Sequence, residues 1–363
     1  MKPHICLYIP SFSDGGVEKT MVTLAGGFVA AGYPTDFLTR GGELPYLERL
    51  DPAVRLLRLP RRVPDVAGYL RDERPAVMMS AKGKDDVLAL DARDAADTDV
   101  KVFLRCGTLL SSRPNMASPN PLRPWWHRRR LRRLYSRPDG VICVSGGVAD
   151  DLSAMTGIPR DLLSVIRNPT ITPGFVRQLA GPCPHPWLAA GRPPVILGAG
   201  SLARVKRFDV LLDAVSPLLS EKDLRLVILG EGKERGALLA QARRSNIGER
   251  VDLPGFVDNI LPYMRLAAVF VLSSEREGSP NVLTEALACG TPVVATDCPS
   301  GPREILAGGR YGPLVPVGDG LAMRRAIREV LTHRPSPEHL QEAVADYRLE
   351  TACEGYLRAF GLG

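Results

Sequence analysis

Short apolar runs alternate along the chain with longer segments of helical pattern. Seven of these runs have the length and the β-branched content of buried strands: residues 5–9, 141–144, 195–197, 224–229, 251–253, 269–272 and 292–295. Strands that alternate with helices in this way are typical of α/β proteins with parallel sheets. The pattern therefore predicts an α/β fold.

The length of the chain indicates more than one domain. It has 363 residues, 45% of them hydrophobic, which is enough to bury two cores. A proline-rich stretch without periodicity follows Pro169 and is the best candidate for a linker. We predict a Rossmann-like domain over residues 1–172, a linker over 173–193, a second Rossmann-like domain over 194–340 and a helical segment over 341–363. Ligands are expected outside the carboxyl ends of the strands, in the cleft between the two halves.

Charge and cysteine content narrow the class of protein. The net charge is +7, so the surface should attract phosphates, anionic lipid or nucleic acid. Seven cysteines without a C-x-x-C pair argue against a disulfide framework or a zinc site, and favour reduced thiols in the cytosol. No run approaches the length of a membrane span, and the apolar part of the N-terminus is too short for a signal peptide. The sequence thus predicts a cytoplasmic protein, soluble or peripheral on the inner face of the membrane.

The excess of basic residues is concentrated in residues 123–137, which include the segment Trp125-Arg137. This segment holds seven arginines and no acid, with Trp125, Trp126, Leu131, Leu134 and Tyr135 interleaved. As a helix it has the composition of a segment at an anionic bilayer surface. A solvated helix that flanks the core is the alternative. Nucleic acid is not expected as a partner, because no binding motif for it accompanies the segment.

Residues 271–306 contain the most informative pattern. A buried strand is followed by a loop with Ser279, Pro280 and Asn281, which we expect to supply a cap and an early proline for a helix over residues 282–289. Unpaired N–H groups at such a helix start favour a phosphate. Glu277 on the loop and Glu285 on the helix, with seven residues between them, are placed to receive hydroxyl groups of the same ligand. Two acids beside a phosphate site indicate recognition of a nucleotide sugar.

This stretch resembles the donor site of retaining GT-B glycosyltransferases of glycosyltransferase family 4, the glycosyl transferases group 1. Their E-x7-E motif corresponds to Glu277 and Glu285, and their A-x-G-x-P-V-V strand to residues 288–294. The resemblance implies two Rossmann-like domains facing across a cleft. It also implies transfer of a hexose or N-acetylhexosamine from a nucleoside diphosphate sugar, most readily a UDP-sugar, with retention of the anomeric configuration. The implied acceptor is a hydroxyl group of a glycan or of a lipid-linked molecule, as in polysaccharide biosynthesis.

Further loops carry the same resemblance. Residues 200–209 are similar to the family's G-R-L-x-x-x-K loop, with Lys206 at the lysine position but Ser201 at the arginine position, so that Arg204 or Arg207 would have to compensate. Glu277 and Lys206 are the implied catalytic residues. The implied donor-binding residues are Gly16, Arg204, Lys206, Gly255, Phe256, Ser279, Pro280, Asn281, Val282, Leu283 and Glu285.

The implied chemistry is stabilisation of a departing diphosphate by Lys206 and by amides of residues 281–284. No Asp-x-Asp constellation occurs, and we expect neither a metal nor a cofactor. Many relatives have a histidine in the first domain, but the corresponding stretch here includes Arg105 and Thr108, which we expect only to shape the acceptor site.

Two alternatives remain open at this stage. Residues 198–203 match the dinucleotide fingerprint, with Glu231 as the ribose-binding acid of an NAD-dependent oxidoreductase. The interval from Gly200 to Glu231 exceeds the usual spacing of about 20 residues. The other alternative is a basic nucleotide- or nucleic-acid-binding protein without catalysis.

Overall fold

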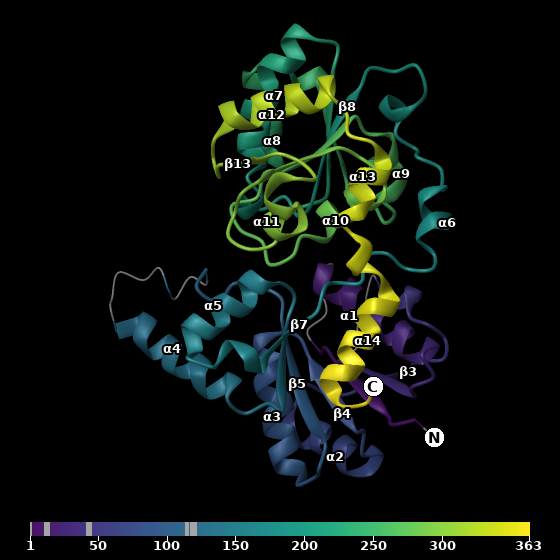
Figure 1. Cartoon of the computed structure of the whole chain (residues 1–363), viewed down its shortest axis with the longest axis vertical. Coiled ribbons are helices and arrows are strands. Elements are labelled where there is room, and N and C mark those ends of the chain that lie inside the picture. Colours follow the sequence, from purple (N-terminus) through teal and green to yellow (C-terminus); the bar gives the residue numbers. More distant parts are fainter. Residues whose placement is uncertain (1, 11–14, 41–45, 113–115, 117–121) are drawn as a thin grey trace. The chain divides into compact units, whose positions relative to one another are not determined.

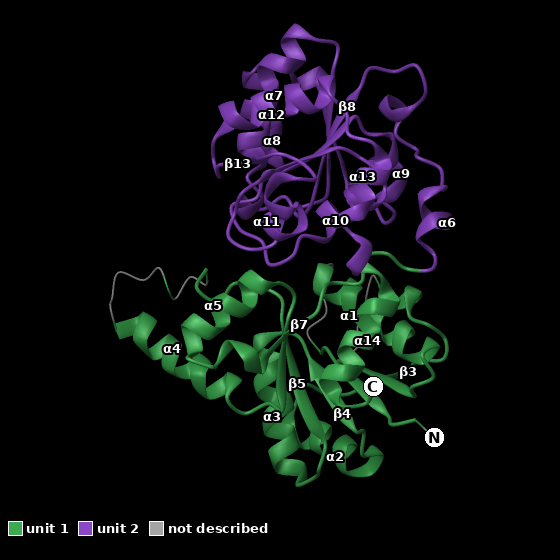
Figure 2. Cartoon of the chain, viewed as in Figure 1, with its two compact units in different colours: residues 1–172, 347–363 green, residues 173–346 purple. Residues whose placement is uncertain are grey.

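The computed structural model describes residues 2–10, 15–40, 46–112, 116 and 122–363. It consists of two compact units (Figure 2). Unit 1 comprises Met1–Thr172 and Tyr347–Gly363, and unit 2 comprises Pro173–Asp346. Each unit is built around one parallel sheet, so the α/β prediction with two Rossmann-like domains is confirmed.

Unit 1 contains a seven-stranded parallel sheet in the order β3-β2-β1-β4-β5-β6-β7. Its strands are β1 (Ile5–Tyr8), β2 (Thr35–Thr39), β3 (Arg55–Arg58), β4 (Val77–Ser80), β5 (Lys101–Cys106), β6 (Gly140–Cys143) and β7 (Leu163–Val165). Its helices are α1 (Gly16–Ala30), α2 (Val63–Glu73), α3 (Gly83–Ala96), α4 (Leu122–Tyr135), α5 (Gly146–Thr156) and α14 (Leu349–Phe360). The strand order reverses direction between β1 and β4.

The two faces of this sheet are covered by different helices (Figure 1). Alternate side chains of β1 point to opposite faces, as the pleat of a strand requires. Cys6 and Tyr8 pack with residues of α2, α3, α4 and α5, whereas Ile5 and Leu7 pack with residues of α1 and α14. Both faces are therefore apolar, which explains why β1 reads as a continuous apolar run.

The C-terminal helix α14 lies with unit 1, although it is far from α1 in the sequence. Phe28 of α1 packs against Tyr356 and Phe360 of α14, with ring centroids 6.2 and 6.0 Å apart. Phe360 also meets Phe103 of β5 at 4.9 Å. This aromatic cluster joins the end of the chain to the sheet formed by its beginning.

Unit 2 contains a six-stranded parallel sheet in the order β10-β9-β8-β11-β12-β13. Its strands are β8 (Val195–Ala199), β9 (Arg225–Leu229), β10 (Val251–Gly255), β11 (Val269–Leu272), β12 (Val293–Thr296) and β13 (Leu314–Val315). Its helices are α6 (Phe175–Leu179), α7 (Phe208–Glu221), α8 (Arg235–Arg244), α9 (Leu261–Leu266), α10 (Asn281–Ala288), α11 (Pro302–Ile305), α12 (Gly320–Thr332) and α13 (Pro337–Glu342). The order reverses between β8 and β11. Helices α7, α8 and α12 share one apolar core with the sheet.

Residues 173–193, where we expected a linker, contain α6 and a short 3-10 helix and belong to unit 2. Asn259 Nδ2 donates to the carbonyl oxygen of Gln178 at 2.8 Å, and Arg265 Nε donates to that of Leu179 at 3.2 Å. His185 Nε2 lies 3.1 Å from a carboxylate oxygen of Asp252. Hydrogen bonds thus hold this proline-rich segment against α9 and β10.

All seven predicted strands are present, but the structure contains six more that the sequence pattern did not single out: β2, β3, β4, β5, β7 and β13. The edge strand β3 (Arg55–Arg58) has polar ends and exposes both of them, so it has no apolar run. In β5, Lys101 and Arg105 interrupt the apolar pattern. Neighbouring strands supply these segments with their partners, which a local pattern does not reveal.

Candidate active site

The candidate site lies at the point in unit 2 where the strand order reverses. Strands β8 and β11 pair side by side, with Ile196 opposite Val269 and Leu197 opposite Phe270. Since the strands are parallel, the loops that follow them, residues 200–207 and 273–280, leave the sheet at the same edge. Open α/β sheets bind their ligands at such a switch point.

An ion pair joins these two loops. Lys206 Nζ lies 2.7 Å from Glu277 Oε1, and the same oxygen accepts a hydrogen bond from Ser274 Oγ at 2.6 Å. Ser273 Oγ donates to the carbonyl oxygen of Lys206 at 2.7 Å. The two implied catalytic residues, 71 positions apart, are therefore in direct contact. The serines were missed by the sequence reasoning, although two serines directly after a buried strand could have indicated them.

Glycines allow the neighbouring strand ends to approach closely. A Cβ atom on Gly230, whose φ is +131°, would lie 2.0 Å from the carbonyl oxygen of Gly200. The Gly230 N–H donates to the carbonyl oxygen of Gly255 at 2.8 Å, and the Gly200 N–H donates to that of Leu229 at 2.9 Å. The ends of β8, β9 and β10 are thus tied together. Phe256, which follows Gly255, has 51% of its surface exposed.

The start of α10 differs from the predicted cap. Pro280 itself occupies the N-cap position and makes no side-chain hydrogen bond to the first turn. The expected stretch thus provides the N-cap residue, but the helix begins at Asn281, one residue earlier than predicted, and the residue at the cap is a proline, which has no side-chain acceptor. The carbonyl oxygen of Pro280 accepts from the N–H groups of Leu283 and Thr284 at 3.1 and 3.4 Å. The first turn of α10, which includes the half-buried Val282, contains no acidic residue, so its positive end is suited to an anion.

The loop before α10 is braced from the segment after β12. Ser300 Oγ donates to the carbonyl oxygen of Gly278 at 3.0 Å. Gly301 has a φ of +72°, and a Cβ atom there would lie 2.7 Å from Pro280 Cδ. This close approach fixes the turn that carries Glu277 and Ser279 toward the helix start.

Glu285 lies one turn into α10 and is buried, with 3% of its surface exposed. Cys289 follows one turn later, and burial, together with the negative charge of Glu285, raises the pKa of its thiol. The position of Glu285 is therefore shielded from water.

The structure distinguishes the two arginines of the Lys206 loop. Arg207 adopts the left-handed conformation at a φ of +49° and pairs with Asp209 at 3.1 Å. Arg204 is exposed and makes no ion pair with any residue that the structure describes. Of the two arginines, Arg204 is therefore the one whose charge no described carboxylate neutralises.

The dinucleotide alternative lacks the helix start that it needs. In that fingerprint the glycines open a helix whose N-terminus holds the pyrophosphate. Here α7 begins only at Phe208, eight positions beyond Gly200. Glu231 contacts Arg235, at 3.4 Å. The geometry of this loop therefore favours a cationic phosphate site over a dinucleotide fingerprint.

In unit 1, Gly16 is the first residue of α1, and the N-cap residue Gly15 supplies no side-chain hydrogen bond. This helix is the one that follows β1 in the sequence, and β1 lies at the reversal of strand order in its own sheet. The start of α1 is therefore a second place where backbone amides face the carboxyl edge of a sheet.

The basic segment forms α4, whose buried face consists of Leu131, Leu134 and Tyr135. Trp125 and Trp126 are 52% and 60% exposed, with ring centroids 4.7 Å apart, and the Arg129 guanidinium lies 5.9 Å from the Trp125 ring. Six arginines of this helix are exposed and form no ion pair within the described ranges: Arg123, Arg128, Arg129, Arg130, Arg132 and Arg133. The outer face of α4 therefore combines unneutralised positive charge with two indole rings.

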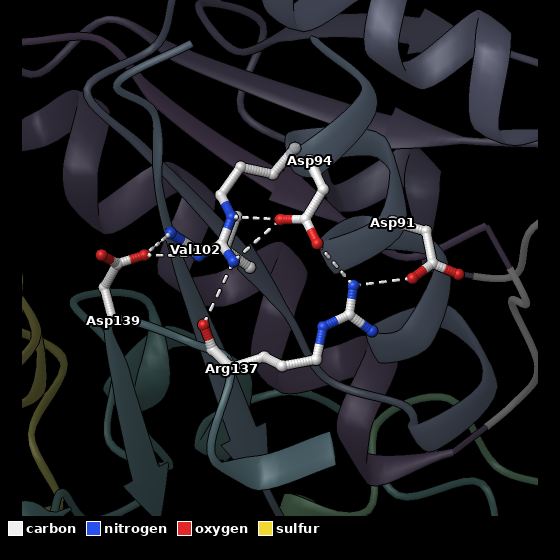
Figure 3. Close-up of polar contacts among 6 residues, drawn as sticks. Asp91, Asp94, Val102, Arg137 and Asp139 are labelled. Atoms are coloured by element: carbon white, nitrogen blue, oxygen red, sulfur yellow. Dashed lines mark hydrogen bonds and ion pairs between the residues drawn. The ribbon is translucent and has the colours of Figure 1, made fainter. Parts of the chain in front are cut away.

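The seventh arginine of the segment has a structural role (Figure 3). Arg137 Nη2 donates to Asp91 at 2.7 Å and to Asp94 at 2.8 Å, both on α3. Hydrogen bonds from Arg137 outweigh the effect of burial and hold the pKa of Asp94 below its usual range. Arg93 donates to the carbonyl oxygen of Arg137 and to Asp139. This network anchors the C-terminal end of α4, so Arg137 does not contribute to its free charge.

All seven cysteines lie in the described ranges and none forms a disulfide. Among the helices that the structure describes, none combines the length and the apolar character that a bilayer crossing requires.

Comparisons with known proteins agree with this architecture. A family model for glycosyl transferases group 1 matches residues 193–333, and one for a glycosyl transferase 4-like domain matches residues 15–169. The lipopolysaccharide core biosynthesis glycosyltransferase LpsE of Rhizobium meliloti is 30% identical over 62% of this chain and 64% of its own. A Campylobacter jejuni protein named N-acetylgalactosamine-N,N'-diacetylbacillosaminyl-diphospho-undecaprenol 4-alpha-N-acetylgalactosaminyltransferase is 40% identical over 38% of this chain and 37% of its own. The matches thus span less than two thirds of these relatives.

Solved structures share the fold over nearly the whole chain. Anabaena HepE in complex with UDP and glucose has a TM-score of 0.80 at 17% identity and covers 99% of both chains. The lipopolysaccharide outer core galactosyltransferase WaaB has a TM-score of 0.71 at 18% identity and covers 98% of both chains. These solved structures show that the chain has the GT-B fold. The two family models, which together match residues 15–169 and 193–333, show that it belongs to the glycosyl transferases group 1, glycosyltransferase family 4.

Proposed function

We propose that the protein is a retaining glycosyltransferase that moves a hexose or N-acetylhexosamine from a UDP-sugar to a hydroxyl of a glycan or lipid-linked acceptor. The observation that carries this proposal is the contact of Lys206 with Glu277 at the strand reversal of unit 2, beside the start of α10. The complex of HepE with UDP and glucose supports the choice of uridine diphosphate.

The chemistry follows from the charge that develops on the donor. The bond between the anomeric carbon and the diphosphate oxygen breaks, and negative charge accumulates on the diphosphate. Lys206, Arg204 and the first-turn amides of α10 would stabilise that charge, which is the largest contribution that a protein makes to such a step.

The ion pair suggests how Glu277 takes part. A diphosphate at Lys206 competes with Glu277 for the ammonium group. Once Lys206 turns toward the diphosphate, the Glu277 carboxylate can hold sugar hydroxyls and support the positive charge at the anomeric carbon, while Ser274 continues to orient it. The acceptor hydroxyl forms the new bond on the face that the diphosphate leaves, and its proton passes to a phosphate oxygen.

A thermal-shift panel tests this function. UDP should raise the melting temperature with a saturating dependence on concentration, because it binds only the folded state, and NAD should not. Sugar nucleotides that raise the melting temperature should also be turned over slowly by water in the absence of an acceptor. A saturating shift with NAD and none with UDP would instead favour the oxidoreductase.

Replacement of Glu285 tests its proposed contact with the ribose diol. Glu285→Gln should weaken UDP binding about 10- to 100-fold, the effect of losing a hydrogen bond to a charged group. Titration calorimetry measures the change, and circular dichroism checks that the buried substitution leaves the fold intact. Glu275→Gln, at an exposed carboxylate of the preceding loop, is the matched control. Equal UDP affinity in both variants would exclude a ribose contact for Glu285.

For the acceptor side we propose that the outer face of α4 docks on an anionic membrane surface. Six exposed arginines supply attraction to anionic lipid, and Trp125 and Trp126 supply rings suited to the headgroup level. A lipid-linked acceptor would then be presented at the surface to which the enzyme binds.

Vesicle sedimentation tests this docking. The protein should sediment with vesicles that contain anionic lipid at low salt, and not with purely zwitterionic vesicles. Each arginine near the surface contributes about 1 kcal/mol, so Arg128→Gln combined with Arg129→Gln should weaken binding about 30-fold. Arg243→Gln with Arg244→Gln, an exposed pair on α8, makes the same charge change elsewhere. Equal losses in the two double variants would show a general charge effect and no docking face.

A further inference from the structure

The carboxyl end of β12 carries a buried hydroxyl group that the proposed mechanism does not use. Thr296 is the last residue of this strand, and none of its surface is exposed. Its Oγ1 lies 2.6 Å from the carbonyl oxygen of Ser274 and 3.3 Å from that of Leu272. A hydroxyl has a single proton to donate, so its hydrogen bond is the shorter contact, to Ser274.

Ser274 connects this hydrogen bond to the candidate site. It is 1% exposed, and its Oγ donates to Glu277 Oε1 at 2.6 Å. Thr296 therefore holds the backbone of the residue whose side chain holds the carboxylate. These two hydrogen bonds, from Thr296 to Ser274 and from Ser274 to Glu277, form what we call the Thr296 relay.

The loops that carry the ion pair are also joined without the help of its charges. Ser273, 1% exposed, donates from Oγ to the carbonyl oxygen of Lys206 at 2.7 Å. The N–H of Glu275 donates to the carbonyl oxygen of Val205 at 2.8 Å. The two loops therefore remain attached to each other when the ion pair opens.

The ion pair cannot itself orient Glu277 during the reaction that we propose. A donor diphosphate draws the ammonium group of Lys206 away from the carboxylate, and the hydroxyl of Ser274 then remains as its partner. A small misplacement of a reacting group costs up to about 100-fold in rate. The backbone of Ser274 must therefore be fixed, and the hydrogen bond from Thr296 fixes it.

Cys298 indicates that the segment after β12 also lies close to Glu277. Burial, and then the negative charge of Glu277, raises the pKa of its thiol to about 12. The thiol is therefore neutral at physiological pH and adds no negative charge beside the carboxylate.

We propose that Thr296 is a positioning residue of glycosyl transfer, which keeps the carboxylate of Glu277 aimed at the sugar through Ser274 after Lys206 has turned to the diphosphate. The inference rests on the proposed function, which assigns Glu277 its contact with the sugar. A carboxylate held in place in this way needs no reorientation as positive charge develops at the anomeric carbon.

The kinetics of Thr296→Val test the relay, because valine keeps the shape of threonine but lacks the hydroxyl. The probes are UDP-glucose and UDP-N-acetylglucosamine, hydrolysed by the full chain without an acceptor. Thr296→Val should lower kcat for the better donor about 10- to 100-fold and leave the Kd for UDP, which has no sugar, unchanged. Ser274→Ala should have the same effect. Thr296→Ser restores the hydroxyl and should restore kcat, even where the lost methyl group lowers the melting temperature.

Thr291→Val is the matched control. Thr291 lies just before the same strand, is 2% exposed and donates from Oγ1 to the carbonyl oxygen of Met264 at 2.7 Å. Both valine variants lose one hydrogen bond to a backbone carbonyl, so their melting temperatures should fall by similar amounts, but only Thr296→Val should lose turnover. In a double variant with Glu277→Gln, Thr296→Val should cause no further loss, because the two residues act through one group.

Two results would overturn the relay: turnover of Thr296→Val equal to that of Thr291→Val while Glu277→Gln is impaired, or independent losses in the double variant. If Thr296→Val does not fold, a wild-type kcat for Ser274→Ala would overturn it. Failure of the proposed function is distinguishable, because the wild type would then hydrolyse neither donor. Hydrogen exchange of residues 274–278 still decides in that case: faster exchange in Thr296→Val than in Thr291→Val retains the relay as a brace of the loop, and equal exchange rejects it.

Discussion

Lys206→Ala is expected to lower the turnover of the sugar nucleotide by about 100- to 1000-fold, the usual effect of removing one group that stabilises charge in a transition state. Lys206 is the half-buried cation at the strand reversal of unit 2 and already contacts the carboxylate of Glu277. The substitution removes the charge that faces the departing diphosphate and leaves Glu277 with Ser274 alone. Steady-state kinetics should show the loss mainly in kcat, because the interaction strengthens as the diphosphate leaves.

Lys233→Ala is the matched control for this experiment. Lys233 is an exposed lysine on the loop after β9, at the same edge of the same sheet, and forms no ion pair with a described residue. It should keep nearly wild-type kinetics. If Lys206→Ala turned over like Lys233→Ala, Lys206 would have no part in the reaction.

Asp36→Asn is expected to lower the free energy of unfolding by about 3 kcal/mol, the lower end of the range for a broken buried ion pair. Asp36 in β2 is 2% exposed and receives hydrogen bonds from Arg55 at 2.8 and 2.5 Å and from the Tyr69 hydroxyl at 2.7 Å. His4 Nε2 lies 3.2 Å away. The asparagine keeps the shape but loses the charge, and the half-exposed Arg55 reduces the cost relative to a fully buried pair. Calorimetric or urea unfolding of the full chain measures the change.

The loss of stability caused by Asp36→Asn should depend on pH. Burial alone would raise the pKa of Asp36, but hydrogen bonds from His4, Arg55 and Tyr69 outweigh it and hold the pKa well below its usual range. A carboxyl with a depressed pKa stabilises the fold above its unfolded pKa of about 3.9, and this contribution is lost as the pH falls further. The difference between wild type and Asp36→Asn should therefore be full near neutral pH and shrink below about pH 4.

Glu73→Gln is the matched control, because it removes the negative charge of an exposed carboxylate that binds the same Arg55, at 2.7 Å. Comparison of the two variants shows how much of the effect of Asp36→Asn comes from burial of the ion pair. Glu73→Gln should cost less than about 1 kcal/mol, as exposed ion pairs do. Equal destabilisation by Asp36→Asn and Glu73→Gln, or a difference from wild type that persists unchanged at low pH, would contradict the role assigned to Asp36.

Local pattern was sufficient for the fold class and for the family. Strands such as β1, β8, β9 and β11 are buried on both faces, so their side chains are apolar in an unbroken run that needs no partner to be recognised. The spacing of Glu277 and Glu285 and the glycines around β8 to β10 are likewise local, because each reflects a turn or a helix start.

Tertiary structure alone decided which of these residues act together. Lys206 contacts Glu277, which Ser274 orients, only because β8 and β11 are neighbours in the sheet. The order of strands in a sheet cannot be read from the local periodicity of the sequence. The buried Arg105 donates a hydrogen bond to Tyr356, 251 positions away, and Arg137 differs from its exposed neighbours through its ion pairs with α3. A residue type states what a side chain can do. Its burial and its partners, which fix charge and pKa, arise only when distant segments pack together.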